Sequence, residues 1–286
     1  MAWILTLAFI LIIHFFIKAE PLLLMILFIT STFLTLKIVV ANNHLSKEDQ
    51  LTYGQWLLFC YGWFGMNPRP FLAFPSRALP GYHFYLIKGV TRILLGLLLI
   101  NSTGFIDGYL STTRFAFILH LLYLIGLSLI LHFGVLNIFA GFLRRLGINV
   151  TSLFKDPIRS KSLSEFWSKR WNLAFVELTT IAVLRPIKSK YGAKAAFWTS
   201  FIFSGLLHEL AISLPVKSGF GKPFAYFIMQ AVLIMSIDTY FIKKQSNNFI
   251  RTFVLLACLF LPIFLLFHKQ FVLQIVLPLV NYLKIV

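Results

Sequence analysis

Charged residues are scarce in this sequence. They make up 12% of its 286 residues, whereas 59% of the residues are hydrophobic. A soluble globular domain carries about 25% charged residues, so this chain has too little polar surface to cover a particle in water. No polar stretch is long enough to form a separate soluble domain. The shortage of charge excludes a cytosolic enzyme and a disordered chain, and it indicates an integral membrane protein.

Acidic residues and cysteines are especially few. Nine Asp and Glu stand against 26 Lys and Arg, and the chain has two cysteines. A strong basic excess can indicate nucleic-acid binding. In a chain this apolar it fits basic loops that lie against anionic lipid headgroups, so no nucleic-acid partner is expected. Cys60 and Cys258 lie far apart in apolar segments without a C-x-x-C partner, which excludes a disulfide scaffold and a redox pair.

Several common catalytic motifs are absent. The zinc motif H-E-x-x-H would need a second histidine at position 212, which is Ile212, and no other histidine pair has helical ligand spacing. We therefore predict no metal site. The sequence has no G-x-S-x-G, so a serine hydrolase has no support. It also has no G-x-G-x-x-G and no P-loop.

Long apolar runs fill the remainder of the chain. A membrane-spanning helix needs about 20 apolar residues, and these runs are continuous rather than alternating, which favours helices. We predict one all-α domain over residues 1–286, a polytopic bundle of eight or nine spans. The membrane would be a bacterial inner membrane or the endoplasmic reticulum, depending on the host. The runs are Met1–Ile17, Leu22–Ala41, Leu51–Met66, Leu86–Ile100, Phe115–Phe142, Leu173–Leu184, Ala193–Pro215, Phe224–Ile242, Ile250–Phe267 and Phe271–Leu283.

The clearest chemical signal is the pair His208-Glu209, inside the run Ala193–Pro215. Ionisable groups at membrane depth are costly unless they are partnered or face water. Helical spacing places Ser200, Ser204 and His208 on one stripe, with Glu209 about 100° round the helix. That stripe would offer hydroxyls and an imidazole to a cavity. The alternative is a core histidine whose ring is bonded to Ser204.

A second group of polar and aromatic residues precedes the run Leu173–Leu184. Ser162 and Glu165 have the spacing of a capping box, so a helix should begin here. Trp167 and Trp171 then share one face of that helix. Tryptophans mixed with basic residues are typical of a helix at the membrane interface.

Two interpretations of this segment stay open. Lys169 and Arg170 can anchor the helix at the interface, and the amide of Asn172 can close the end of the next helix. Alternatively, Asn172 is a functional group, since it lies where the chain turns apolar.

These residues carry a resemblance to a known family. The segment resembles the core of the membrane-bound O-acyltransferase superfamily and, in detail, its wax synthase-like branch. The similarity covers roughly residues 60–270, and the combination of the FW…RWN and SG..HE pieces is fairly specific. The matching pieces are Phe166-Trp167-x-x-Arg170-Trp171-Asn172, Arg185-Pro186, Ser204-Gly205-x-x-His208-Glu209 and, upstream, Gly65–Phe71.

The resemblance implies a site and a reaction. The superfamily pairs an asparagine with a downstream histidine in a membrane-embedded tunnel, and Asn172 and His208 are 36 residues apart, close to the expected separation. The implied reaction is acyl transfer from acyl-CoA to the hydroxyl of a lipophilic alcohol, as in wax ester synthesis. His208 would be the general base. Asn172 would orient the alcohol or donate to the developing oxyanion.

The remaining expectations concern binding. Acyl-CoA is expected as a co-substrate, with no cofactor, and the other partners are the alcohol and membrane lipids; the oligomeric state is not predicted. Lys169 and Arg170 are candidates for the CoA phosphates. The other candidate substrate-binding residues are Glu209, Ser204, Trp171 and Trp167. An alternative function is a carrier or channel that uses His208 and Glu209 as a proton or solute site, although the sequence shows no internal repeat.

Overall fold

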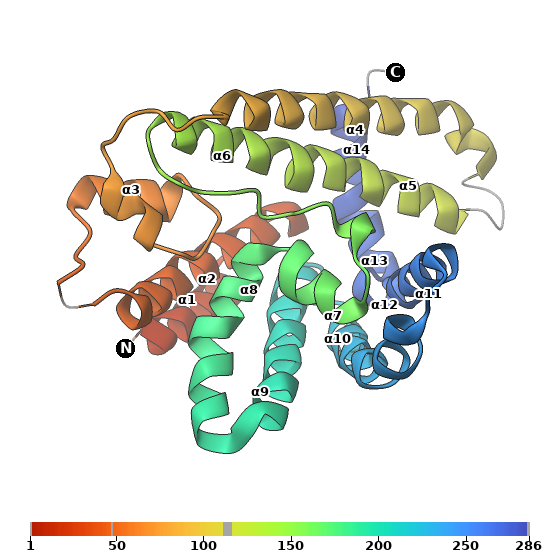
Figure 1. Cartoon of the computed structure of the whole chain (residues 1–286). Helices are drawn as coiled ribbons and strands as arrows, with labels where there is room; N and C mark the ends of the chain where they lie inside the picture. The colour runs from red at the N-terminus through yellow and green to blue at the C-terminus, as the bar shows by residue number, and fades with distance from the viewer. Residues whose placement is uncertain (1, 47, 111–115, 285–286) are drawn as a thin grey trace. The chain divides into compact units, whose positions relative to one another are not determined.

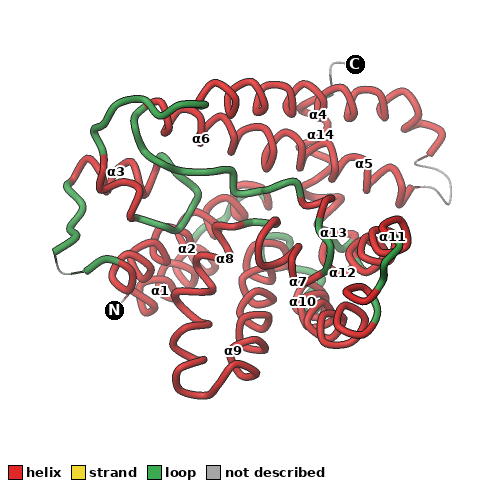
Figure 2. The backbone as a smooth tube through the Cα atoms, viewed as in Figure 1, coloured by secondary structure: helices red, strands yellow, loops and turns green. Residues whose placement is uncertain are grey.

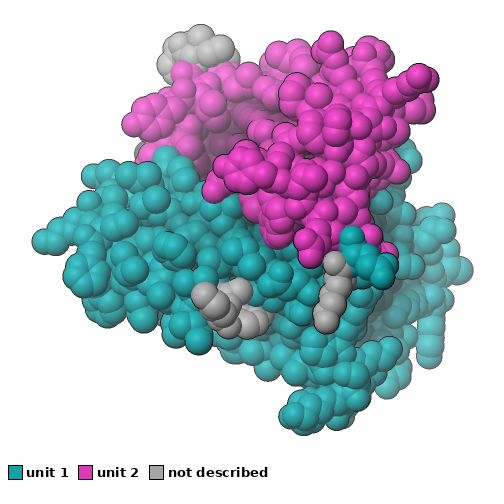
Figure 3. All heavy atoms as spheres, turned by 90° about the vertical axis from the view of Figure 1, so that its left-hand side faces the viewer, with its two compact units in different colours: residues 1–48, 65–67, 155–271 teal, residues 49–64, 68–154, 272–286 magenta. Residues whose placement is uncertain are grey.

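A computed structural model of the chain describes residues 2–46, 48–110 and 116–284 (Figure 1). Within these residues the secondary structure is helical and contains no strand (Figure 2), so the all-α prediction is confirmed. The helices form two compact units, drawn in separate colours in Figure 3. Unit 1 comprises residues 1–48, 65–67 and 155–271, and unit 2 comprises residues 49–64, 68–154 and 272–286. The single-domain organisation stays a prediction.

Six helical stretches in the described part of the chain are long and apolar enough to cross a membrane. The chain is therefore an integral membrane protein, but the predicted eight or nine spans are not confirmed. The six stretches are Pro21–His44, Tyr82–Gly104, Ala116–Arg145, Leu173–Ser213, Lys222–Lys244 and Asn248–Leu266.

Some predicted runs form helices shorter than a span requires. Helix α1 (Ala2–Phe16) has 15 residues and stops before the polar break that leads to Pro21, the first residue of α2 (Pro21–His44). Helix α3 (Tyr53–Tyr61) has nine residues and ends at Gly62. The C-terminal run is divided into α13 (Lys269–Phe271), the π-helical η9 (Val272–Val276) and α14 (Leu277–Leu283).

Unit 2 is built around two long helices that pack lengthwise. One is α4 (Tyr82–Leu110). The other is continuous from α5 (Ala116–Ser128) through the π-helical η2 (Leu129–Val135) to α6 (Leu136–Arg145). A Cβ atom on Gly96 would lie 2.7 Å from the carbonyl oxygen of Gly126, so glycine allows the two backbones to approach closely. Gly134 lies in this π-helical segment. The 3₁₀ helix η1 (Arg69–Ala73) completes the unit before α4.

Unit 1 contains a helical hairpin. Its first limb is α8 (Leu173–Thr179), continued by the π-helical η5 (Thr180–Leu184) and the start of α9 (Arg185–His208), and its second limb is the part of α9 after Gly192. The chain turns back at Gly192, whose φ of 83° is outside the helical region. η5 packs against α9, and Figure 1 shows the two limbs running side by side.

Other helices of unit 1 enclose the upper part of this hairpin. The short α7 (Leu163–Glu165) continues as the π-helical η4 (Phe166–Arg170) and leads into α8. After α9 come the π-helical η6 (Glu209–Ser213), α10 (Lys222–Leu233) and the π-helical η7 (Ile234–Asp238). The unit also contains the 3₁₀ helices η3 (Pro157–Arg159) and η8 (Ile242–Lys244), α11 (Asn248–Phe260), α12 (Ile263–Leu266) and α13, together with the N-terminal helices α1 and α2. Four of its segments are thus π-helical, a form that often occurs at functional sites.

Candidate active site

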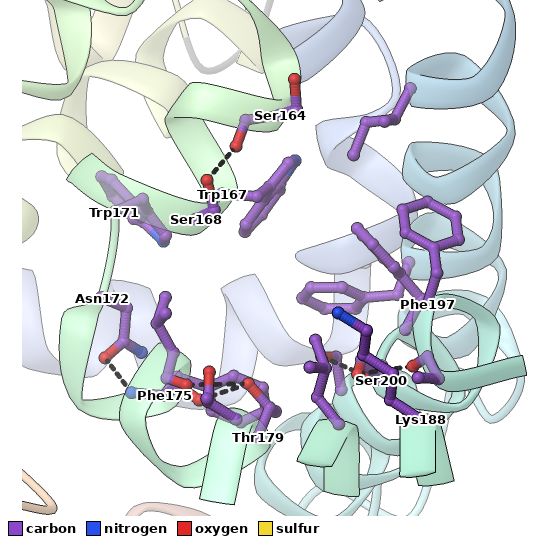
Figure 4. A pocket seen from close by; sticks show the side chains of 18 of the residues that line it. Ser164, Trp167, Ser168, Trp171, Asn172, Phe175, Thr179, Lys188, Phe197 and Ser200 are labelled. Atoms are coloured by element: carbon purple, nitrogen blue, oxygen red, sulfur yellow. Dashed lines mark hydrogen bonds between the residues drawn. The ribbon is translucent and has the colours of Figure 1, made fainter. Parts of the chain in front are cut away.

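A cavity of about 380 Å³ lies in unit 1, between the limbs of the hairpin and next to α7 and η4 (Figure 4). Its walls come from α7–η4, from both limbs of the hairpin and from α10–η7. The apolar part of the lining includes Trp167, Trp171, Phe175, Phe197, Phe201 and Phe227. The polar lining residues are Ser164, Ser168, Asn172, Thr179, Thr180, Lys188, Ser200, Ser204 and His208.

The structure brings most of the sequence-predicted residues to this cavity. His208, Asn172, Ser204, Trp167 and Trp171 all line it, and Ser200 does so too, as the helical stripe predicts. The lining does not include Glu209, Lys169 or Arg170.

The ring of His208 is held in one protonation pattern by its own helix. Its Nδ1 lies 2.7 Å from the carbonyl oxygen of Ser204. A carbonyl oxygen can only accept, so Nδ1 carries the hydrogen, and the neutral ring then has its lone pair on Nε2. The ring packs against Phe227, with centroids 4.2 Å apart, and against Phe175 at 5.8 Å. The alternative of a core histidine predicted a bond between this ring and Ser204, and that bond is present. It uses Nδ1, so Nε2 is left available at the wall of the cavity.

Asn172 combines the two interpretations that the sequence left open. Its backbone is left-handed, with φ of 46° and ψ of 65°, and its Oδ1 accepts the N–H of Phe175 at 3.3 Å to cap α8 (Figure 4). Asparagine adopts this conformation more readily than most residues and is a strong helix cap. Its Nδ2 donates to no side chain or carbonyl among the described residues, so the amide group can also donate into the cavity that it lines.

Glu209 points away from the cavity and joins α9 to α10. Its Oε1 accepts the N–H of Phe224 at 3.0 Å, in the first turn of α10, where a negative charge is favourable. The two helices are in close contact, because a Cβ atom on Gly205 would lie 2.8 Å from Cδ2 of Phe224. The carboxylate of Glu209 therefore links the end of α9 to the first turn of α10.

Arg170 is bound to its own segment. Its Nε lies 2.7 Å from Oε1 of Glu165, and its Nη1 donates to the carbonyl of Lys155 at 3.3 Å. Desolvation alone would raise the pKa of Glu165, but the N–H of Lys161 and the guanidinium of Arg170 outweigh it and hold the pKa below its ordinary value. Lys169 is exposed.

Several lining residues were missed by the sequence reasoning, among them Thr179, Thr180 and Lys188. Thr179 and Thr180 follow Asn172 by seven and eight residues, so the helical period that found Ser200 and Ser204 could have found them too. Lys188 had no signal of its own, because it is one of several basic residues near the hairpin turn.

Comparison with known proteins gives this site a family context. Residues 150–229 match the profile of the membrane bound O-acyl transferase family. The chain is 33% identical over 132 residues to probable long-chain-alcohol O-fatty-acyltransferase 2 of Arabidopsis thaliana, covering 42% of this chain and 37% of that protein. It is 38% identical over 73 residues to probable long-chain-alcohol O-fatty-acyltransferase 1 of the same plant, covering 23% and 21%. The long-chain-alcohol O-fatty-acyltransferase of Simmondsia chinensis is 27% identical over 73 residues, again covering 23% and 21%.

These matches cover well under half the length of each relative. The family profile nevertheless falls on the part of the chain that forms the cavity, because every lining residue except Ile234 lies between residues 150 and 229. The resemblance to the wax synthase-like branch is confirmed by these relatives and by the match of residues 150–229 to the profile of the membrane bound O-acyl transferase family.

Proposed function

We propose that this protein is an acyl-CoA-dependent O-acyltransferase that esterifies the hydroxyl of a lipophilic, long-chain alcohol. The observation that carries the proposal is that His208 and Asn172 line one largely apolar cavity, with the Nδ1–H of His208 bound to the carbonyl of Ser204. The similarity to proteins named long-chain-alcohol O-fatty-acyltransferases supports the choice of acceptor.

In the proposed reaction, His208 is the general base. Its Nε2 accepts the proton of the alcohol hydroxyl as the alcohol oxygen attacks the thioester carbonyl carbon. The carbon–sulfur bond of the resulting tetrahedral intermediate then breaks, and the imidazolium returns the proton to the leaving CoA thiolate. The products are an ester and free CoA. The bond from Nδ1 to the Ser204 carbonyl keeps the ring in the tautomer that this step requires.

Asn172 is proposed to stabilise the negative charge that develops on the thioester oxygen. Its Nδ2 hydrogens are donors, and its Oδ1 is already fixed by the N–H of Phe175, which orients the amide before substrate binds. A group held in advance in this way costs little reorganisation during the reaction.

We propose that the cavity is part of a tunnel inside the membrane protein that admits two hydrophobic chains. The rings of Trp167, Trp171 and Phe197 would pack against those chains, and the hydroxyl of Ser204 would face them. Lys169 and Arg170, on the segment next to the cavity, would supply positive charge toward the CoA phosphates. Glu209 would act indirectly, by holding the helix that carries His208.

Thiol release tests the proposal. Purified protein with a long-chain acyl-CoA and a long-chain alcohol should release free CoA, and omitting the alcohol should abolish most of that release. A carrier or channel would release no thiol. Equal release with and without alcohol would indicate thioester hydrolysis and would contradict the proposed transfer.

A further inference from the structure

Asp238 is a fully buried carboxylate that binds a helix other than its own. It ends η7, and its exposed fraction is 0%. Its Oδ1 accepts the N–H of Leu163 at 2.6 Å, and its Oδ2 accepts the N–H of Ser164 at 3.2 Å and the hydroxyl of Ser164 at 2.7 Å. Nζ of Lys243 lies 3.4 Å from Oδ2. A buried carboxylate is tolerated only when its oxygens are paired, and here both are.

The bonds of Asp238 complete the N-terminus of the segment formed by residues 163–170. The first four N–H groups of a helix have no partner within it. The hydroxyl of Ser162 accepts the third N–H of the segment, that of Glu165, at 3.0 Å, and its carbonyl accepts the N–H of Phe166 at 3.0 Å as the first helical bond. The first two belong to Leu163 and Ser164, and Asp238 is their acceptor. The negative charge also lies at the end of the helix where it is most favourable.

Gln230, on the preceding helix α10, binds the same segment. It is fully buried, lies eight residues before Asp238, accepts the indole N–H of Trp167 at 3.2 Å, and donates to the carbonyl of Cys258 at 2.9 Å. Apolar packing joins the same elements. The buried residues of that cluster are Leu163, Phe166, Ile234, Ile242, Leu255 and Leu259.

The segment that Asp238 fixes forms one wall of the cavity and leads through Trp171 to Asn172, the cap of α8. Ser164, Trp167 and Trp171 line the cavity, and the ring of Trp171 stacks on the buried ring of Phe166, with centroids 5.4 Å apart and planes 13° from parallel. Figure 4 shows the two indoles and Asn172 on consecutive parts of that wall. Displacement of residues 163–170 would therefore move Asn172 relative to the cavity.

We propose that Asp238 is a positioning residue of the active site: by binding the first turn of residues 163–170 it sets the place of Asn172. This inference rests on the proposed acyl transfer for its kinetic consequence. It does not rest on that function for its structural consequence, which is that residues 163–170 loosen when the carboxylate is removed.

The test replaces the charge and keeps the size of the side chain. In Asp238→Asn, amide hydrogen exchange in peptides covering residues 160–172 should accelerate at least about tenfold, because two N–H groups lose a charged acceptor. Peptides covering residues 193–208 should not change. The kcat for acyl transfer should fall about 10- to 100-fold with a much smaller change in KM, because a misplaced group acts on the transition state.

Two further single variants and a double-mutant cycle with Asn172→Ala complete the test. Lys243→Gln removes the cation and leaves the bonds to residues 163 and 164 in place, so its exchange and kcat should stay within about twofold of wild type. Asp238→Glu retains the charge and should keep more activity than the Asn variant. It also serves as the test variant if Asp238→Asn does not fold well enough to be purified. In an Asn172→Ala background, Asp238→Asn should lower kcat by less than about threefold, since the group it positions is gone.

The outcomes separate the two claims. Unchanged amide exchange in residues 160–172 would overturn the claim that Asp238 holds this segment. Faster amide exchange with a normal kcat would overturn the positioning role. So would a loss of kcat from Asp238→Asn that is as large in the Asn172→Ala background as in the wild type. If wild-type protein releases no thiol with any acyl-CoA and alcohol, the proposed function fails, and the exchange experiment still decides whether Asp238 holds the segment.

Discussion

Asn172 caps a helix in this structure and is proposed to act in catalysis, and three substitutions can separate the two roles. Its Oδ1 caps α8, its backbone is left-handed, and its Nδ2 is proposed to donate to the oxyanion. Asn172→Asp keeps the cap and the tolerance for a left-handed backbone, and a negative charge at a helix N-terminus gains about 0.3–1 kcal/mol, so the free energy of unfolding should not fall. Asn172→Gly loses the cap but relieves the backbone, at a cost of a few tenths of a kcal/mol.

Asn172→Ala should be the least stable of the three variants. It loses about 1 kcal/mol with the cap, and alanine lacks the polar side chain that helps asparagine to adopt the left-handed conformation. All three variants lose the Nδ2 donor, so each should lose about 10²–10³-fold in kcat if that donor stabilises the oxyanion. The Asp variant should lose most, because its charge repels the oxyanion.

Thermal unfolding and single-turnover rates, measured on the same preparations, are the assay. The diagnostic result is an Asp variant that is as stable as wild type and nearly inactive. If the Asp variant keeps most of the wild-type rate and only Ala loses it, Oδ1 accepts from the alcohol and the oxyanion assignment is refuted. If rates per folded molecule are normal in all three variants, Asn172 is only a helix cap.

Three other predictions follow from the same geometry. His208→Ala should lower kcat at least about 10²-fold while the protein still inserts and folds, and near-normal turnover in a folded variant would exclude the general base. Replacing Lys169 and Arg170 together by Gln should raise KM for acyl-CoA more than it lowers kcat; a constant KM with poor membrane insertion would indicate topology anchors instead. Gly205→Val should reduce the free energy of unfolding by about 1–3 kcal/mol, because its side chain would overlap Phe224; thermal unfolding equal to wild type would show that the helices can separate without cost.

Much of the site follows from helical periodicity alone. Ser200, Ser204 and His208 share a stripe in an apolar run, and in the structure all three line the cavity. The same spacing turns Glu209 away, and its carboxylate bonds to Phe224. Local rules succeed here because residues 193–208 form a regular helix, in which side-chain direction depends only on position.

The number of spans was harder to predict than the site, because it depends on the length of the helix that forms in each apolar run. The runs that became α1 and α3 are apolar, but α1 ends after 15 residues and α3 after nine. Hydropathy identifies apolar segments and does not say where the helix within them stops. A periodicity of 3.6 residues per turn also could not predict the π-helical segments η4, η5, η6 and η7.

Asp238 shows the limit of sequence reasoning most clearly. From the sequence it is an acid near basic residues at a helix end, the usual setting of an interfacial charge. Its carboxylate accepts the N–H groups of Leu163 and Ser164, which lie about 75 residues away in the chain, and only tertiary packing brings them together.

The most direct test of the proposed acyl transfer follows the alcohol oxygen. Purified protein would be given a long-chain acyl-CoA and a long-chain alcohol whose hydroxyl oxygen carries a heavy isotope, and ester and free CoA would be quantified together. The account predicts one ester for each CoA released, with the label retained in the ester, because the alcohol oxygen attacks the acyl carbon. Free CoA without labelled ester, or no CoA at all, would contradict it.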